Sequence, residues 1–361
     1  MSTAAASQHP QDFAAFLELS ARLGQDVTRT QGAGGNSSIK QDGMMWVKAS
    51  GTWLAHALEK DVMVPVEVAP LVEALRQGDP RAEKATDFVV TALNACGLRP
   101  SIETSFHAAL PQRVVAHFHC VNTLALAVLE NRDALIAERM ATLPDLSFVM
   151  IPYRRPGTPL AIEIERVAAD LPDVLVLCNH GIIITGTSVE QVAERIERVT
   201  KALSSPQRAP APVDRAFLQA KAEGTGFRVA AEDETHATAL DAVSMQVALG
   251  GSLYPDHVIF LGTSIGVLKD GQTVAELLAE FEAQNLPAPK MLLAAGKGVL
   301  LDAGLTPGGE ALARCLAEVV TRVPAGEAIS YLTADQEYEL SNWEAEQYRQ
   351  ALDRKTAAAA R

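Results

Sequence analysis

Between residues 113 and 202, short apolar runs alternate with segments of helical periodicity, and this alternation limits the folds open to the chain. The runs RVVAHFH, FVMIPY, VLVLCNHG and IIIT are short and rich in β-branched residues, which predicts buried strands. The segments between them, including VNTLALAVLE and SVEQVAERIERVTKAL, carry apolar residues at helical spacing. Strands that alternate with helices indicate an α/β layer architecture with a buried sheet.

A proline-rich stretch, SSPQRAPAPVD, interrupts this pattern and predicts a domain boundary. Before it, we also predict a helix over 82–96. After it, we predict a helix over 237–249, a strand in HVIFLG and a second, smaller α/β unit. The expected parts are a loose tail over 1–10, a first domain over 11–204, a linker over 205–214 and a C-terminal domain over 215–361.

Composition narrows the classes of partner. The formal charge is −13, and no basic cluster is longer than the pair Arg154 and Arg155, so nucleic acid and anionic membranes are poor partners. No apolar stretch approaches the roughly 20 residues that span a bilayer. The four cysteines are far apart and lie mostly within apolar runs, which suits buried thiols in a reducing compartment. We therefore expect a cytoplasmic protein.

Two histidines, His117 and His119, end the apolar run RVVAHFHC. Residues two apart on a strand point to the same face, so the two imidazoles are expected side by side. A pair of this kind is either a metal site or two histidines hydrogen-bonded within a core. A third histidine, His180, follows the apolar strand VLVLC and precedes Gly181, at a strand end that delivers its side chain into a cleft. Three imidazoles with an open position match a catalytic zinc site.

A proton-transfer group is predicted in RPSIETSFH. Glu103 stands near the start of a predicted helix, where the helix dipole favours a carboxylate. The alternative is that Ser101 caps the helix and Glu103 faces water in its first turn. His107, four residues later on the same face, is either a partner of Glu103 or a packed helix residue.

Two loops are rich in backbone donors. The loops GGNSS (residues 34–38) and SGT (residues 50–52) can offer N–H and hydroxyl groups to a phosphate or a carboxylate, or they are simply tight turns. Neither loop is a dinucleotide fingerprint or a Walker loop.

Taken in order, GGNSSIK, VKASGT, PSIETSFH, AHFH and NHGIIITG resemble the class II (zinc-dependent) aldolase and adducin-head family over about residues 11–204. The resemblance implies a three-layer domain with a central β-sheet. It also implies that His117, His119 and His180 hold Zn2+, or another divalent metal such as Mn2+ or Co2+, and that Glu103 is the acid/base. The residues implied to grip a substrate phosphate are Gly35, Asn36, Ser50, Gly51 and Ser101.

One position departs from the family pattern. Fuculose-type sugar-phosphate aldolases have two serines before the glutamate, whereas here the second is Ile102, which removes one phosphate donor. The C-terminal part, with YPDHVIFLG and GKGVLL, is similar to the aldolase part of bifunctional rhamnulose-phosphate aldolase/alcohol dehydrogenases.

The resemblance implies a metal-dependent aldolase that cleaves or forms a C–C bond in a small sugar or sugar phosphate through a metal-stabilised enediolate. An epimerase or decarboxylase on the same scaffold is the nearest alternative, and a non-catalytic adducin-like module is a third. The family also implies a homo-oligomer, commonly a tetramer.

Overall fold

A computed structural model describes residues 9–343, 351 and 352. Most of the expected tail over residues 1–10 lies outside the described residues. Contacts divide the chain into two compact units. Unit 1 comprises residues up to 119 together with 140–177 and 181–202; unit 2 comprises residues 120–139, 178–180 and those from 203 onward. The expected domain boundary near residue 204 stays a prediction, since residues 120–139 and 178–180 group with the later part of the chain.

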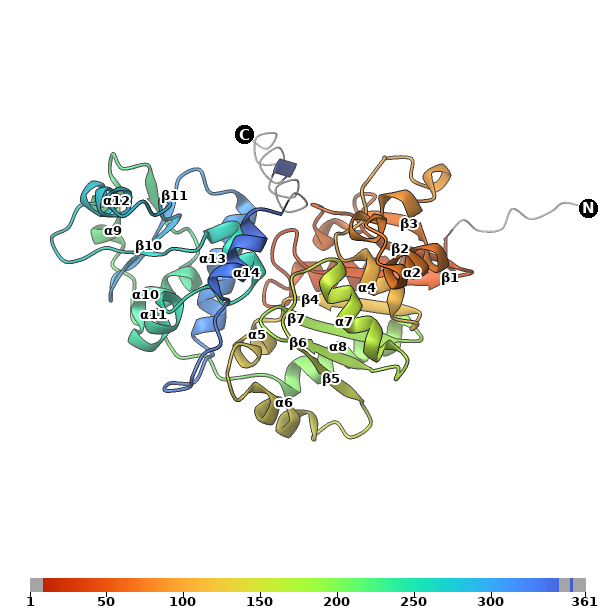
Figure 1. The fold of residues 1–361 in the computed structure, drawn as a ribbon. Helices are drawn as coiled ribbons and strands as arrows, with labels where there is room; N and C mark the ends of the chain where they lie inside the picture. The colour runs from red at the N-terminus through yellow and green to blue at the C-terminus, as the bar shows by residue number, and fades with distance from the viewer. Residues whose placement is uncertain (1–8, 344–350, 353–361) are drawn as a thin grey trace, which may run out of the picture. The chain divides into compact units, whose positions relative to one another are not determined.

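Unit 1 is built on a seven-stranded mixed sheet with the order β3-β2-β1-β4-β7-β6-β5 (Figure 1). Neighbouring strands are antiparallel except for β5 and β6, which are parallel. The strands are β1 (Asn36–Gln41), β2 (Met44–Lys48), β3 (Met63–Glu67), β4 (Val114–Phe118), β5 (Phe148–Ile151), β6 (Val174–Leu177) and β7 (Gly181–Gly186).

Helices cover both faces of this sheet. One layer consists of α2 (Val68–Gln77), α3 (Arg81–Lys84), α4 (Thr104–Ala109) and α7 (Thr158–Ala168), which pack against one another. Their apolar side chains, such as Leu71 and Phe106, form one core with Val47, Val115 and Ile183 of the sheet. The other layer consists of α1 (Phe13–Gln25) and α8 (Val189–Ala202). The predicted three-layer α/β fold is confirmed.

The pairing of β1 with β4 decides which side chains meet. Asn36 lies opposite His117, and Ser38 lies opposite Val115, a member of the core beneath α4. Because side chains alternate along a strand, Asn36, Ser38 and His117 share the α4 face of the sheet. Ser37 points the other way, and its Oγ lies 2.8 Å from the Oγ of Ser20 in α1.

Unit 2 holds a four-stranded sheet with the order β8-β11-β10-β9. The sequence predicted a smaller α/β unit in the C-terminal part but neither the number nor the order of its strands. The strands of unit 2 are β8 (Phe227–Val229), β9 (Gly266–Val267), β10 (Met291–Ala294) and β11 (Gly298–Asp302). Its α-helices are α5 (Val121–Ala127), α6 (Arg132–Met140), α9 (Arg215–Ala222), α10 (Ala237–Leu240), α11 (Ala242–Leu249), α12 (Val274–Ala283), α13 (Pro307–Val320) and α14 (Ala334–Ser341).

Three sequence predictions of local structure are wrong. The helix expected over 82–96 ends at Lys84, because Ala85 has a φ of 53° and Val89 forms a bridge with Val66 of β3. The strand expected in HVIFLG is instead a π-helical turn over His257–Leu261. The helix expected over 237–249 breaks at Asp241, which is extended and caps α11 with its side chain. Short apolar runs that are buried on all sides carry no periodicity with which to separate helix from strand.

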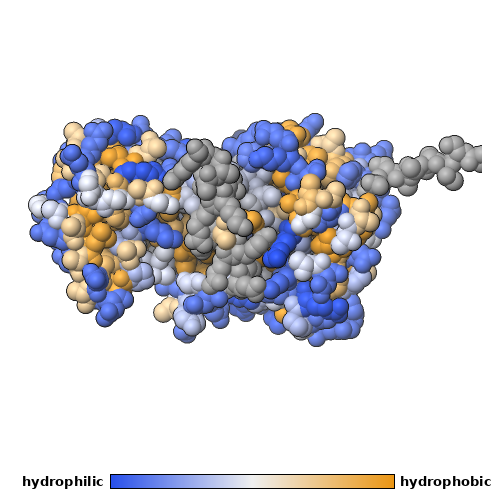
Figure 2. All heavy atoms as spheres, turned by 90° about the horizontal axis from the view of Figure 1, so that it is seen from above, coloured by the Kyte–Doolittle hydropathy of each residue, from blue (hydrophilic) through white to orange (hydrophobic). Residues whose placement is uncertain are grey.

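The described surface is mixed in polarity. Figure 2 shows hydrophilic residues over much of one face, with apolar residues in several separate groups. No helix within residues 9–343, 351 and 352 combines the length and the apolar character that a membrane crossing requires.

Candidate metal centre

The end of β4 delivers two of the three histidines. His117 lies within the strand, and His119 follows it by two residues, on the same face. The Nε2 atoms of the two rings lie 3.2 Å apart. Two imidazole nitrogens bound to one tetrahedral zinc at 2.0–2.1 Å are separated by about 3.3 Å, so this spacing fits a shared cation.

The third histidine reaches the same place through a tight turn. Cys178, Asn179 and His180 join β6 to β7, whose residues Leu177 and Gly181 pair directly. Because β7 also pairs with β4, the turn lies at the end of β4 that carries His119. One ring nitrogen from each of the three histidines lies within 4.8 Å of the others.

A glycine makes this approach of the turn to β4 possible. A Cβ atom on Gly181 would stand 2.7 Å from the carbonyl oxygen of Phe118 and 3.1 Å from Cδ2 of His119. Contacts below about 3 Å are not tolerated at a rigid backbone atom, so residue 181 admits no side chain. In the N-H-G sequence, His180 is the candidate ligand, and the absence of a side chain at Gly181 lets the turn lie against β4.

Burial and tautomer suit these rings to metal binding. His117, His119 and His180 are 0%, 6% and 4% exposed. Nδ1 of His117 donates to the carbonyl oxygen of Ile182 at 3.1 Å, which leaves the lone pair of Nε2 directed at the cluster. Imidazole nitrogens are common ligands of Zn2+ and of other divalent transition metals. The structure brings together the three residues that the sequence grouped, and the metal itself stays a prediction.

Glu103 lies beside the histidine cluster. It immediately precedes α4, as the sequence indicated, and it is 5% exposed. Its Oε2 atom lies 3.5 Å from Nε2 of His117 and accepts a hydrogen bond from Nδ2 of Asn36 at 2.7 Å. The carboxylate therefore faces the cluster, and the alternative in which it faces water does not describe this structure.

A chain of hydrogen bonds fixes the orientation of Asn36. Its Nδ2 also donates to Oγ of Ser101 at 3.1 Å, and its Oδ1 accepts from Nε2 of His107. Oγ of Ser38 donates to Nδ1 of the same ring at 2.8 Å. Burial holds the pKa of His107 well below its usual range, so the ring is neutral, with one nitrogen donating and the other accepting. Because the His107 N–H bonds the Oδ1 atom of Asn36, the NH2 group of Asn36 faces Glu103.

His107 is thus a partner within this network rather than merely a packed helix residue. The sequence indicated Ser38 only as part of the donor-rich loop over residues 34–38. The structure corrects this, because β1 begins at Asn36 and Ser38 bonds His107. The N-S-S alternation held the signal, since residues 36 and 38 share one face of a strand.

The two loops expected to bind an anion come together near Ser101. A bridge between Ala49 and Pro100 and a bond from the Ser50 N–H to the Arg99 carbonyl oxygen join the second loop to the segment before Glu103. Gly51 has a φ of 73°. Oγ of Ser101 accepts the Glu103 N–H at 3.2 Å.

The first loop is closely packed at Gly35. Gly35 has a φ of 60°, and a Cβ atom at this residue would stand 2.9 Å from the carbonyl oxygen of His117. Gly35 therefore lets the loop lie directly on the strand that carries the histidines. The grip of Gly35, Asn36, Ser50, Gly51 and Ser101 on a phosphate stays a prediction.

Lys48 was missed from the sequence. It is 2% exposed, and its Nζ donates to the carbonyl oxygens of Ala33 at 2.7 Å and Thr52 at 2.6 Å. A single ammonium group therefore joins the two donor-rich loops and adds positive charge to them. The signal was a lysine inside the apolar run MMWVKAS, since a lysine is rarely buried without partners.

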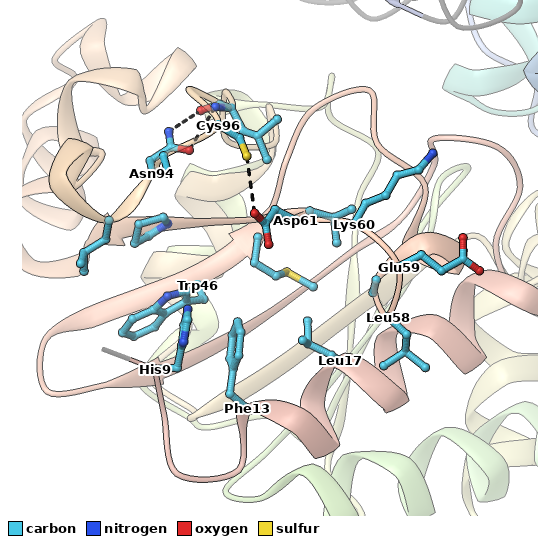
Figure 3. Close-up of a pocket in the computed structure, with 17 residues that line it drawn as sticks. His9, Phe13, Leu17, Trp46, Leu58, Glu59, Lys60, Asp61, Asn94 and Cys96 are labelled. Atoms are coloured by element: carbon cyan, nitrogen blue, oxygen red, sulfur yellow. Dashed lines mark hydrogen bonds between the residues drawn. The ribbon is translucent and has the colours of Figure 1, made fainter. Parts of the chain in front are cut away.

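A separate hollow of about 480 Å³ lies elsewhere in unit 1 (Figure 3). Phe13, Leu17 and Trp46 line it together with Asp61 and Cys96, and none of the predicted site residues, all of which the structure describes, is in its lining. The Cys96 thiol donates to the Asp61 carboxylate at 3.5 Å, and this carboxylate raises the pKa of the thiol. A thiol with a raised pKa is a poor nucleophile, so Cys96 is not expected to react as a thiolate here.

Comparisons with known proteins identify the family of this chain. A model of the "Class II Aldolase and Adducin N-terminal domain" family matches residues 15–205. The chain is 28% identical over 199 residues to the uncharacterized oxidoreductase YuxG of Bacillus subtilis, covering 51% of this chain and 28% of that protein. It is 30% identical over 118 residues to the 3-oxo-tetronate 4-phosphate decarboxylase of Escherichia coli K12, covering 28% of this chain and 53% of the enzyme. The chain spans about half or less of the length of these relatives.

Solved structures align with a little over half of the chain. The N-terminal class II aldolase domain of a conserved protein from Thermoplasma acidophilum aligns with 23% identity and a TM-score of 0.47, covering 56% of this chain and 97% of that one. A sugar-phosphate aldolase from Thermotoga maritima aligns with 15% identity and a TM-score of 0.41, covering 52% of this chain and 90% of that one.

Proposed function

Because the chain belongs to the class II aldolase and adducin N-terminal domain family, we propose that it is a metal-dependent aldolase acting on a small sugar or sugar phosphate. The observation that carries the proposal is the buried cluster of His117, His119 and His180, whose ring nitrogens lie within 4.8 Å of one another, with the Glu103 carboxylate 3.5 Å from His117. Buried imidazoles beside a buried carboxylate match a metal site paired with a proton-transfer group.

The three histidines would hold Zn2+, or Mn2+ or Co2+ in its place. A divalent cation bound there supplies Lewis-acid chemistry, drawing electron density from the oxygens of a hydroxylated carbonyl compound. The hydrogen bond from His117 Nδ1 to the Ile182 carbonyl oxygen keeps the ring in the orientation that this role needs.

Glu103 moves the proton in this proposal. When the C–C bond breaks, the hydroxyl group of the departing carbon loses its proton as that carbon becomes an aldehyde, and the electron pair of the bond remains on the carbon next to the carbonyl group. Glu103 delivers a proton to that second carbon, so one proton is lost and one is gained; synthesis reverses both transfers. The amide of Asn36 holds the carboxylate in one orientation, and Ser101 holds the amide. Prior orientation of this kind lowers the cost of reaching the reactive geometry.

An anionic group on the substrate fits the two donor-rich loops. Gly35, Ser50, Gly51 and Ser101 provide the donors in the proposal, while Asn36 is shared with Glu103. The buried charge of Lys48 supports an anion at these loops. Ile102 offers no hydroxyl, so we propose a site with fewer side-chain donors to phosphate than the fuculose-type pattern has.

A decarboxylase is the second candidate. It is favoured by the similarity to 3-oxo-tetronate 4-phosphate decarboxylases at 30% identity. Decarboxylation and aldol cleavage both leave an electron pair on a carbon next to a carbonyl group, so the same residues serve both. The two reactions differ in whether carbon dioxide or an aldehyde leaves.

Metal content and product analysis together test the proposal. Protein purified without chelator should contain about one divalent metal per chain, and far less would favour an adducin-like binding module. A panel of ketoses, ketose phosphates and 3-oxo acid phosphates then separates aldehyde release from carbon dioxide release or epimerisation. Glu103→Gln should keep the metal and lose about 10²–10⁴-fold in turnover, whereas His119→Ala should lose both. Near wild-type turnover in Glu103→Gln would contradict the proton-transfer role.

We further propose a homo-oligomer and a cytoplasmic location. The oligomer is supported by the family resemblance. The location is supported by the four cysteines, all of which the structure describes: they form no disulfide with one another and three of them are buried, which suits a reducing compartment.

A further inference from the structure

Asn179, the residue before His180, has an unusual set of contacts. It is 3% exposed and has a φ of 52°, in the left-handed region that asparagine tolerates better than most residues. Its Nδ2 donates to the carbonyl oxygen of Leu253 at 2.9 Å and to that of Ser330 at 2.6 Å. These carbonyls lie 74 and 151 positions further along the chain.

The two acceptor segments are themselves held within unit 2. The Ser330 N–H donates to the carbonyl oxygen of Val128 at 2.8 Å, and the Leu332 N–H donates to that of Ser252 at 2.8 Å. The Leu253 N–H donates to Nδ1 of His257 at 3.3 Å. Both carbonyls that Asn179 reaches therefore belong to segments with defined positions.

The left-handed backbone alone does not require these bonds. Glycine adopts the same φ without a side chain, and asparagine in a simple turn bonds its own neighbouring backbone. Here the amide bonds only distant carbonyls among its described hydrogen bonds, and it does so from a buried position next to a proposed metal ligand.

We propose that Asn179 is a positioning residue for the metal site, through which the segments around Leu253 and Ser330 set the place of the His180 ring. This inference rests on the proposed function, because His180 is a ligand only if the site binds metal. Both segments lie beyond residue 205, where the family match ends. In this proposal, the C-terminal part of the chain therefore helps to position a metal ligand.

Cobalt affinity of the metal-free, full-length protein tests this proposal. Asn179→Gly keeps the left-handed φ and removes only the amide. It should weaken Co2+ binding by about 10–100-fold in calorimetric titration, the range for residues that orient a ligand. The matched control is Asn285→Gly, which replaces an exposed asparagine with a φ of 54° and should bind within twofold of wild type.

The outcomes separate this inference from the proposed function. If the wild type binds Co2+ and Asn179→Gly binds it within twofold, the inference fails and the metal site stands. If the wild type binds no Co2+, both fail. Should Asn179→Gly not fold, hydrogen exchange in the wild type decides: Co2+ should slow exchange of the Ser330 and Leu332 amides, because coupling between two sites is reciprocal. Unchanged exchange there would overturn the inference.

Discussion

Replacing Asn36 with alanine should destabilise unit 1 by an amount set by its buried hydrogen bonds. The side chain is 3% exposed, donates to Glu103 at 2.7 Å and to Ser101 at 3.1 Å, and accepts from His107, which is 0% exposed. A buried polar group that loses its partner costs about 1–3 kcal/mol. Both the Glu103 carboxylate and the His107 N–H lose this partner, so the free energy of unfolding should fall by about 2–6 kcal/mol.

Urea unfolding of the metal-free protein measures this loss. Trp46 and Trp53 lie in unit 1, whereas Trp343 lies in unit 2. With Trp343→Phe as the common background of all variants, tryptophan fluorescence reports on unit 1. The control is Asn94→Ala, which removes a part-buried amide that bonds only the backbone of Leu98, and it should cost about 1 kcal/mol or less.

A double-mutant cycle sharpens the same experiment. If Asn36 and His107 act as one network, Asn36→Ala and His107→Phe should be non-additive by about 0.5–3 kcal/mol. An Asn36→Ala cost no larger than that of Asn94→Ala, together with additive effects, would refute the network.

Two further perturbations follow from the geometry. Gly35→Ala should cost more stability than Gly43→Ala, by about 1–3 kcal/mol in chemical unfolding: both positions have positive φ, but only the Cβ at residue 35 meets another atom, the His117 carbonyl oxygen at 2.9 Å. Equal costs would show that the loop yields freely. Burial lowers the pKa of His257 from 6.5 to about 4, so the unfolded chain binds more protons there between these pH values. The resulting stability is present above pH 6.5 and is lost as pH falls through about 4, by on the order of 3 kcal/mol. His257→Gln, which can still accept the Leu253 N–H, should lose less stability over this window, and an unchanged pH profile would contradict the assignment.

The parts of the site that follow from local periodicity were predictable. The spacing of two residues put His117 and His119 on one strand face, and the position of His180 after an apolar run placed it at a strand end. Both inferences need only the alternation of a strand and the location of its end.

The parts that depend on pairing between distant segments were not predictable. Nothing near Asn36 in sequence shows that it lies opposite His117, so the contact of its amide with Glu103 could not be foreseen. The π-helical turn over His257–Leu261 was mistaken for a strand for a related reason. All five of its residues are buried, and a run that is apolar on every side fits either structure.

The alternation along β1 has a consequence for how this sequence can diverge. Asn36 and Ser38 face the histidines while Ser37 faces α1, so inserting or deleting one residue within the strand exchanges the two sets of side chains. A substitution alters one contact, but a change of length inverts all of them at once. We therefore expect relatives with a working site to differ freely in the length of the surrounding loops and to keep this strand at constant length.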